Sequence, residues 1–320
     1  MLAPPHTFTS DQLELYLQRI QYAEDATANG TSRLACLQKS IEQDPLSALT
    51  QLQQKHIATI PWGNSALHYS QHKTISIHPT AIFEKLVVRR LDGYCMENTN
   101  LIYIVLRTLG YQVYPTGGRV SCAVATVNPA NEGYLSLGHM ILIVTIADHK
   151  YMVDVGFGSN GPTRPLLLQE NASAILMAPS EMRLIKASLA EFVDKSQKVW
   201  VYQARHNPES AWVPHYSFSE VEFLPQDFGM MNFATSNQRS SWFTQALVCT
   251  RVILDETDAE PVGLYIMAGK EVKKRVGGHT EVVATVETES DRVQALGKWF
   301  GMHFHEHEVE GVRGLPSQIK

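Results

Sequence analysis

The sequence predicts an α/β protein with three parts: a helical N-terminal domain, a β-rich middle domain and a mixed α/β C-terminal domain. Two changes in the apolar pattern lead to this prediction. Apolar residues recur with the helical period as far as residue 110, and from Tyr111 they form strand-like runs separated by turn residues. Beyond residue 219, strand-like runs precede a last helical segment. We therefore place the domains at residues 1–112, 113–218 and 219–320.

Length and charge favour small-molecule chemistry. The 320 residues are enough for two or three domains and a sizeable core. A formal net charge of −5 offers no basic face for nucleic acid or an anionic membrane. The longest apolar run, residues 140–146, is far shorter than a bilayer span, and the N-terminus lacks the features of a signal peptide. We expect a soluble, cytoplasmic protein with no membrane or nucleic-acid partner.

The cysteines and the histidine-rich end of the chain suggest no structural metal. The 4 cysteines lie far apart without a C-x-x-C pair, which argues against a disulfide framework and a zinc knuckle. Alternating histidines occur at His303, His305 and His307. Such residues near a chain end are more often solvated than metal-bound, so we expect no metal.

Residues 10–56 contain two amphipathic helices. Ser10 stands in the N-cap position of the first, and the second, over residues 45–56, ends before Ile60-Pro61 because a residue ahead of proline is disfavoured in the α region. The apolar side of the first helix consists of Leu13, Tyr16, Leu17 and Ile20. Both apolar faces are expected to lie in the core.

Cys95 is predicted to lie at the start of a third helix. The buried face of this helix would be formed by Leu101, Ile104, Val105, Thr108 and Leu109. Gly110 then serves as its C-terminal stop. The unpaired N–H groups and the dipole at a helix N-terminus favour an anion, so a cysteine there is favoured as a thiolate nucleophile. Taken alone, Cys95 could equally be a buried structural cysteine.

The middle domain brings a histidine and an aspartate within reach of each other. Strands are expected at residues 120–127, 139–146 and 150–155, with breaks at residues 116–118 and 128–133. If Ala147-Asp148 forms a two-residue hairpin turn, Asp154 pairs with Ile141 and His139 is its diagonal neighbour. Diagonal Cα atoms lie roughly 7–8 Å apart, which allows a side-chain bond. A turn placed one residue earlier would make His139 and Asp154 directly opposed.

In the C-terminal domain, strands are expected at residues 216–223, 246–254 and 262–267, and a closing helix at residues 290–301. Residues 232–243 form a polar segment rich in serine and threonine. Lys273, Lys274 and Arg275 form a basic run that is expected to be solvated, with a contact to a coenzyme phosphate as the second interpretation.

Several motifs, taken in order, resemble those of the arylamine N-acetyltransferase family, and the pattern is similar to that of its fungal members. The central ones are Cys95, then Gly138-His139 ahead of an apolar strand, then Val153-Asp154-Val155-Gly156-Phe157-Gly158. Further matches lie at residues 16–20, 60–62, 83–87 and 232–243. The resemblance covers most of residues 13–255.

The resemblance implies a β-barrel-like middle domain, a C-terminal lid and a cysteine-protease-like core with a Cys95–His139–Asp154 triad. It further implies ping-pong transfer of an acyl group from acyl-coenzyme A to Cys95 and then to an arylamine or arylhydrazine. The acceptor pocket falls on Gly138 and Phe157. Coenzyme A contacts fall on Thr235 and Ser240.

One departure from the family pattern lies before the cysteine. The family has Arg-Gly-Gly-x-Cys, whereas this chain has Leu91-Asp92-Gly93-Tyr94-Cys95. A carboxylate at residue 92 opposes a thiolate, and Arg90 and an imidazolium of His139 favour it. If Asp92 is solvated, the imidazolium should outweigh it, and Asp92→Gly with Leu91→Arg should speed acylation modestly.

Two other functions remain open on the sequence. A papain- or transglutaminase-like cysteine hydrolase shares the order cysteine, histidine, aspartate, and a non-catalytic paralogue would bind coenzyme A or aromatics without turnover. The sequence does not distinguish acetyl, propionyl and malonyl donors.

Overall fold

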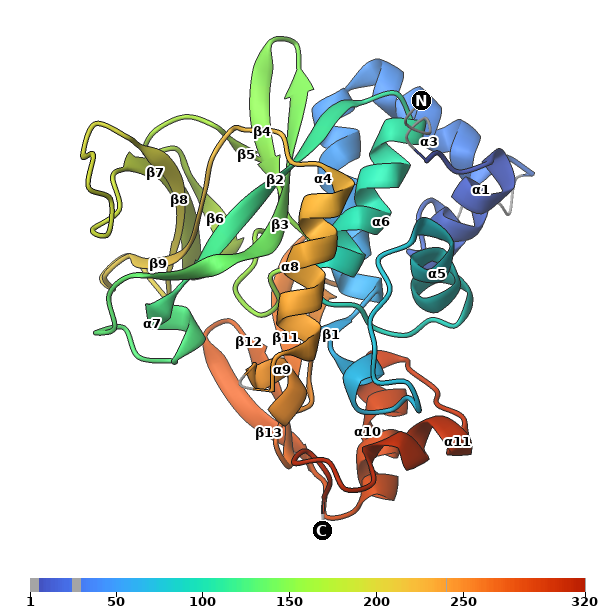
Figure 1. The fold of residues 1–320 in the computed structure, drawn as a ribbon. Helices are drawn as coiled ribbons and strands as arrows, with labels where there is room; N and C mark the ends of the chain where they lie inside the picture. The colour runs from blue at the N-terminus through green and yellow to red at the C-terminus, as the bar shows by residue number, and fades with distance from the viewer. Residues whose placement is uncertain (1–5, 25–29, 240, 320) are drawn as a thin grey trace.

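The computed structural model describes residues 6–24, 30–239 and 241–319. Two antiparallel sheets organise them (Figure 1): an eight-stranded, nearly closed, barrel-like sheet in the order β5-β4-β3-β2-β9-β8-β7-β6, and a five-stranded sheet in the order β1-β10-β11-β12-β13. The N-terminal helices, drawn in blue and teal, lie beside the larger sheet. The predicted α/β class, with helices first and a barrel-like middle, is confirmed. The exact domain boundaries stay a prediction.

The N-terminal part is helical, as its apolar periodicity predicts. Its elements are α1 (Ser10–Arg19), α3 (Arg33–Gln43), α4 (Pro45–Thr59), the short η1 (Ser65–Leu67), α5 (Pro79–Phe83), the π-helical turn η2 (Glu84–Val88) and α6 (Cys95–Thr108). The N-cap of α1 is Thr9 and not Ser10, because Thr9 and Gln12 form a reciprocal capping box. The predicted end of α4 before Pro61 is confirmed.

The larger sheet corrects two strand predictions, since the strand expected at residues 216–223 ends at Phe218 and the one expected at residues 120–127 is mostly absent. Its strands are β2 (Gln112–Ser121), β3 (Tyr134–Ile146), β4 (His149–Val153), β5 (Leu166–Leu167), β6 (Ser173–Met177), β7 (Ser180–Ala187), β8 (Val199–Arg205) and β9 (Val213–Phe218). The strand predicted at residues 120–127 is wrong for most of its length, since α7 (Cys122–Ala125) occupies it.

The break predicted at residues 116–118 is also wrong, because these residues lie inside β2. A β-carbon on Gly117 would lie 2.5 Å from the Phe223 ring, and one on Gly118 would lie 2.6 Å from Ile141 Cδ1. The two glycines therefore permit close packing against neighbouring side chains and do not form a turn.

The C-terminal part adds a sheet and helices. Its elements are α8 (Pro225–Asn237), α9 (Trp242–Gln245), β10 (Val248–Leu254), β11 (Pro261–Ala268), β12 (Glu271–Val276), β13 (His279–Thr285), α10 (Glu289–Phe300), α11 (Glu306–Val309) and the turn η3 (Glu310–Val312). The smaller sheet also takes β1 (Trp62–Gly63) from the N-terminal part. The polar segment at residues 232–243 proves largely helical. The predicted closing helix is confirmed as α10, which ends at Gly301 in the left-handed conformation.

Helices α6 and α8 both pack against β3 (Figure 1), which brings the start of α6 close to the strands of the middle domain. The main apolar core joins the N-terminal helices to the side of β3 that carries Met140, Leu142 and Val144. Within the described residues, no helix has the length and apolar character needed to cross a membrane.

Candidate active site

Backbone hydrogen bonds to the segment around β1 fix the loop that leads into α6. Gly93 donates its N–H to the Pro61 carbonyl at 3.2 Å, and the Gly93 carbonyl accepts from the Gly63 N–H at 3.1 Å. Asn98 Nδ2, on the first turns of α6, donates to the same Gly93 carbonyl at 2.5 Å. Cys95 therefore begins α6 at a set position, as the sequence predicts.

Asp92 is buried and not solvated, which corrects the expectation drawn from the family pattern. Its carboxylate is 0% exposed and accepts hydrogen bonds from Ser65, one from the N–H at 3.1 Å and one from the hydroxyl. A β-carbon on Gly63 would collide with this carboxylate. Burial raises the pKa of Asp92, and the nearby Lys85 ammonium lowers it. Asp92 is thus a structural group that ties the nucleophile loop to residues 63–65.

Restoring the family residues with Asp92→Gly and Leu91→Arg should therefore destabilise the protein and not speed acylation. The substitution leaves the buried Ser65 N–H and hydroxyl without an acceptor, which costs about 1–3 kcal/mol in the free energy of unfolding. Urea unfolding would measure this loss. Asp92→Asn, which keeps the volume and one oxygen, should lose less. Faster acylation with unchanged stability would favour the original expectation.

An ion pair lies at the start of α6. Glu97 is 1% exposed, accepts the Tyr94 N–H at 3.2 Å and binds Lys85 Nζ at 2.7 Å. Burial raises the pKa of Glu97, and Lys85 lowers it. Arg90 is exposed. The partly buried Lys85, and not Arg90, therefore supplies the cation that pairs with Glu97.

The predicted contact between His139 and Asp154 is present. Strands β3 and β4 form a hairpin with Ala147 and Asp148 in its turn at φ 47° and 65°, and Leu142 pairs with Val153. This register places Asp154 beyond Val153, diagonal to His139. His139 Nε2 and Asp154 Oδ2 are 2.7 Å apart. The geometry agrees with the two-residue turn and not with the directly opposed alternative.

Cys95 and His139 lie side by side. The Cys95 thiol donates to the Gly138 carbonyl at 3.6 Å. Burial lowers the pKa of His139, but the Asp154 carboxylate and the Cys95 sulfur raise it more strongly, to about 10. The imidazole is therefore held as an imidazolium at neutral pH, with Asp154 at Nε2. A β-carbon on Gly156 would lie 2.6 Å from Cys95 Cα, so glycine allows the segment after Asp154 to pack against the Cys95 backbone.

Aromatic rings enclose the imidazole. The His139 ring lies 5.2 Å from Phe157 in an edge contact and 4.9 Å from Tyr216. Gly118 on β2 pairs with His139 on one side and with Phe218 on the other, and Tyr216 lies on the same face of β9 as Phe218. Sequence analysis missed Tyr216, because the contact depends on the strand order, and its only signal was the strand-like pattern around it.

Three of the four predicted binding residues lie close to Cys95 or His139. Gly138 contacts the thiol through its carbonyl, and Phe157 contacts His139. Thr235, on α8, lies near the site, since its Oγ1 would be 3.7 Å from a β-carbon on Gly138. Ser240 lies outside the described residues.

A second aromatic cluster, not predicted, borders the nucleophile loop. Phe243 makes edge contacts with Tyr94 at 5.7 Å and Trp62 at 5.9 Å, and Trp242 stacks on it at 4.5 Å. The Tyr94 hydroxyl also donates to Asn232 of α8. The segment of α8 and α9 therefore forms a wall beside Cys95.

This arrangement suits covalent acyl chemistry. It combines a thiol at a helix N-terminus, an imidazole beside it and a carboxylate bound to the imidazole. In the described part of the chain, no group of three or more histidine, cysteine, aspartate or glutamate side chains is placed to hold a metal.

Comparisons with known proteins point to one family. A family model described as N-acetyltransferase matches residues 45–309. N-malonyltransferase FDB2 of Gibberella moniliformis is 33% identical over 325 residues, covering 95% of this chain and 92% of that protein. The arylamine N-acetyltransferase of Escherichia coli (strain K12) is 29% identical over 211 residues, which cover 66% of this chain and 68% of that protein.

Solved structures show the same likeness. The arylamine N-acetyltransferase from Salmonella typhimurium has a TM-score of 0.73 at 25% identity, covering 96% of this chain and 98% of that one. The Mycobacterium marinum arylamine N-acetyltransferase in complex with CoA has a TM-score of 0.73 at 26% identity, covering 95% and 99%. The likeness thus extends beyond the residues 13–255 that carry the sequence motifs.

Proposed function

Because the chain belongs to the arylamine N-acetyltransferase family, we propose that it transfers a short acyl group from acyl-coenzyme A to an aromatic amine or hydrazine through a thioester on Cys95. The observation that carries the proposal is the contact of His139 with both Cys95 and Asp154, which provides a nucleophile, a base and an orienting group. Acyl transfer is the chemistry of the family, and the residue roles and substrates are the proposal.

In the first half-reaction, the Cys95 sulfur attacks the acyl carbonyl, a new C–S bond forms and the bond to coenzyme A breaks. The imidazolium of His139 gives its proton to the departing coenzyme A thiolate. In the second half-reaction, the amine attacks the thioester and His139 takes the amine proton, so that the amide leaves and the thiolate returns. Asp154 holds the ring throughout, and the N–H groups at the start of α6 stabilise the developing oxyanion.

Of the donors left open by the sequence, we rank malonyl-coenzyme A and acetyl-coenzyme A first. The relative that matches 95% of this chain is named an N-malonyltransferase, and other relatives are named arylamine N-acetyltransferases. A donor with an extra carboxylate would also test how the site tolerates negative charge near Asp154.

The proposed function is tested by incubating the chain with each donor and no acceptor, and then measuring its intact mass. We expect the mass of one acyl group, mapped to Cys95, for at least one of the acetyl, propionyl and malonyl donors. Adding a simple aniline should then discharge the label as the amide. A cysteine hydrolase or a non-catalytic paralogue would gain no stable acyl group, and that result would reject the proposal.

Iodoacetamide should inactivate the protein readily at pH 6, with a rate that changes little up to pH 9. The pKa of His139 is raised to about 10, so the imidazolium beside the sulfur is lost only as the pH rises through that value. An adjacent imidazolium favours the reactive thiolate. His139→Gln removes that positive charge, so at pH 6 it should react much more slowly than the parent. Equal rates for the two proteins at pH 6 would favour the non-catalytic paralogue.

A further inference from the structure

The buried side chain of His68 joins the C-terminal segment to the aromatic wall beside Cys95. Its Nδ1 lies 2.7 Å from Ser317 Oγ, and its Nε2 lies 3.0 Å from the Phe243 carbonyl. Nε2 also lies 3.1 Å from Asn64 Nδ2, but both hydrogens of that amide go to the Phe243 and Ala246 carbonyls. Nε2 therefore carries the ring proton and donates it to the Phe243 carbonyl, and Nδ1 accepts from the Ser317 hydroxyl. Burial lowers the pKa of His68 to about 4, which keeps the ring neutral. The two partners thus fix one tautomer of His68.

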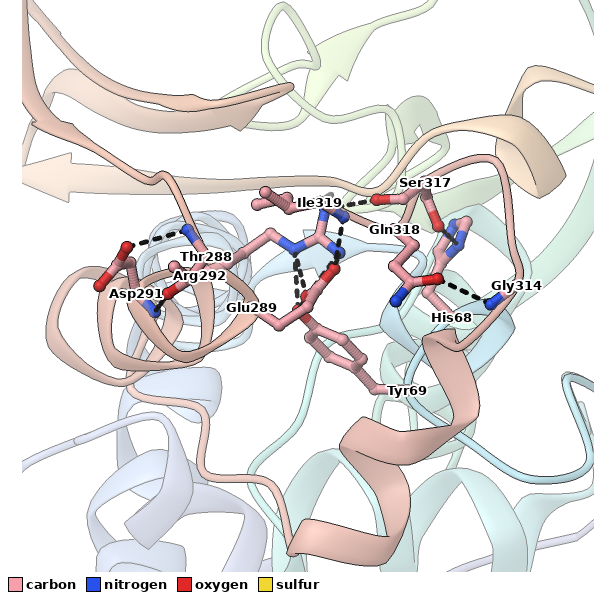
Figure 2. A network of polar contacts seen from close by, with 10 residues as sticks. All are labelled: His68, Tyr69, Thr288, Glu289, Asp291, Arg292, Gly314, Ser317, Gln318 and Ile319. Atoms are coloured by element: carbon pink, nitrogen blue, oxygen red, sulfur yellow. Dashed lines mark hydrogen bonds and ion pairs between the residues drawn. The ribbon is translucent and has the colours of Figure 1, made fainter.

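Residues 314–319 are anchored to α10 (Figure 2). Arg292, which is 3% exposed, donates from Nη1 to the Ser317 carbonyl at 2.9 Å. Glu289 accepts the Ile319 N–H at 2.8 Å and pairs with Arg292 at 2.6 Å. Tyr69, next to His68 in the chain, donates to Glu289 at 2.6 Å. The segment therefore reaches His68 in a fixed position and not as a loose tail.

The other partner of His68, Phe243, contacts the residue directly before Cys95. The Phe243 carbonyl accepts from His68 and also from Asn64 Nδ2 at 2.7 Å, and Asn64 Nδ2 further donates to the Ala246 carbonyl at 2.8 Å. The Phe243 ring contacts Tyr94, the residue directly before Cys95. A hydrogen bond made at residue 317 is thus connected, through His68 and Phe243, to the wall of the candidate site.

We propose that residues 314–319 are a latch that holds the Phe243–Tyr94 wall in place, with His68 as the positioning residue between them. Releasing the latch loosens the wall and exposes the Cys95 sulfur to bulky reagents. It also weakens binding of the acyl donor, which contacts this wall. The consequence for the donor rests on the proposed function, whereas the consequence for access to Cys95 does not.

Ser317→Ala tests the latch with little disturbance, because it removes the hydroxyl and leaves the Ser317 carbonyl bound to Arg292. The rate of Cys95 modification by a bulky maleimide is measured with Cys36 and Cys122, the two partly exposed cysteines, replaced by serine. We expect Ser317→Ala to react about two- to tenfold faster, the fold-change that corresponds to one lost hydrogen bond. Ser317→Thr keeps the hydroxyl and should react like the parent, as should Ser290→Ala, an exposed serine on α10.

Steady-state kinetics complete the test. In Ser317→Ala, KM for the acyl donor should rise by a similar factor while kcat changes less than twofold, and Ser317→Thr should restore KM. Unchanged maleimide reactivity in Ser317→Ala would overturn the latch, whatever the protein's activity. Faster modification in a protein that forms no acyl-enzyme with any donor would leave the latch standing and reject the proposed function.

Discussion

Replacing Cys95 with alanine should abolish acyl transfer and leave a folded protein. Cys95 supplies the only sulfur that contacts His139 among the residues whose placement the structure describes, and loss of a nucleophile costs about five or more powers of ten in kcat. The fold should tolerate the change, because the start of α6 is held by bonds to Gly93 and Glu97 and not by the thiol. Besides its contact with His139, the thiol makes one weak hydrogen bond, at 3.6 Å, to the Gly138 carbonyl.

The measurements are the steady-state rate with an aniline acceptor and a urea unfolding curve. Cys249→Ala is the matched control, since Cys249 is also a buried free thiol, 0% exposed on β10, but belongs to a different core cluster. Cys249→Ala should leave turnover within a factor of about two, while its unfolding free energy falls by about 1 kcal/mol. Turnover retained in Cys95→Ala, or an acyl label that still forms, would assign the chemistry to another residue.

Local patterns in the sequence were sufficient for the framework of the candidate site. The position of Cys95 follows from the apolar spacing up to Leu109 and from Gly110. The pairing of His139 with Asp154 follows from a two-residue turn, because the register of a hairpin is set by its loop length. Both features involve residues close in sequence, where periodicity and turn chemistry are informative.

Features that depend on distant segments were missed. Burial of Asp92 depends on donors from Ser65, and the close packing at Gly117 involves Phe223, more than 100 residues later in the chain. The basic run was also misjudged in part. Arg275 is half-buried and donates to Asn160 Oδ1 at 3.0 Å, which ties β12 to the loop after Phe157. A side chain's solvation cannot be inferred from its neighbours in sequence when its partners come from another element.

Asp154→Asn should give the second-largest loss, a fall in kcat of about three to four powers of ten with the fold retained. Asp154 Oδ2 accepts from His139 Nε2, and Oδ1 accepts from the Gly156 N–H at 2.8 Å. In the asparagine variant, the Gly156 N–H selects the amide oxygen, so the NH₂ group faces His139 Nε2 and donates to it. Nδ1 then carries the ring proton toward the sulfur, and the imidazole cannot accept a proton from the thiol or the amine.

The same substitution removes the carboxylate that favours the imidazolium, so the inactivation of Cys95 by iodoacetamide at pH 6 should slow together with turnover. Asp148→Asn is the matched control, because Asp148 lies in the turn of the same hairpin at φ 65°, a conformation that asparagine adopts readily. We expect Asp148→Asn to match the parent in kcat, in alkylation rate and in unfolding free energy. If Asp154→Asn also stayed within a few-fold of the parent in kcat, Asp154 would be a structural residue, and the orienting role assigned to it would be wrong.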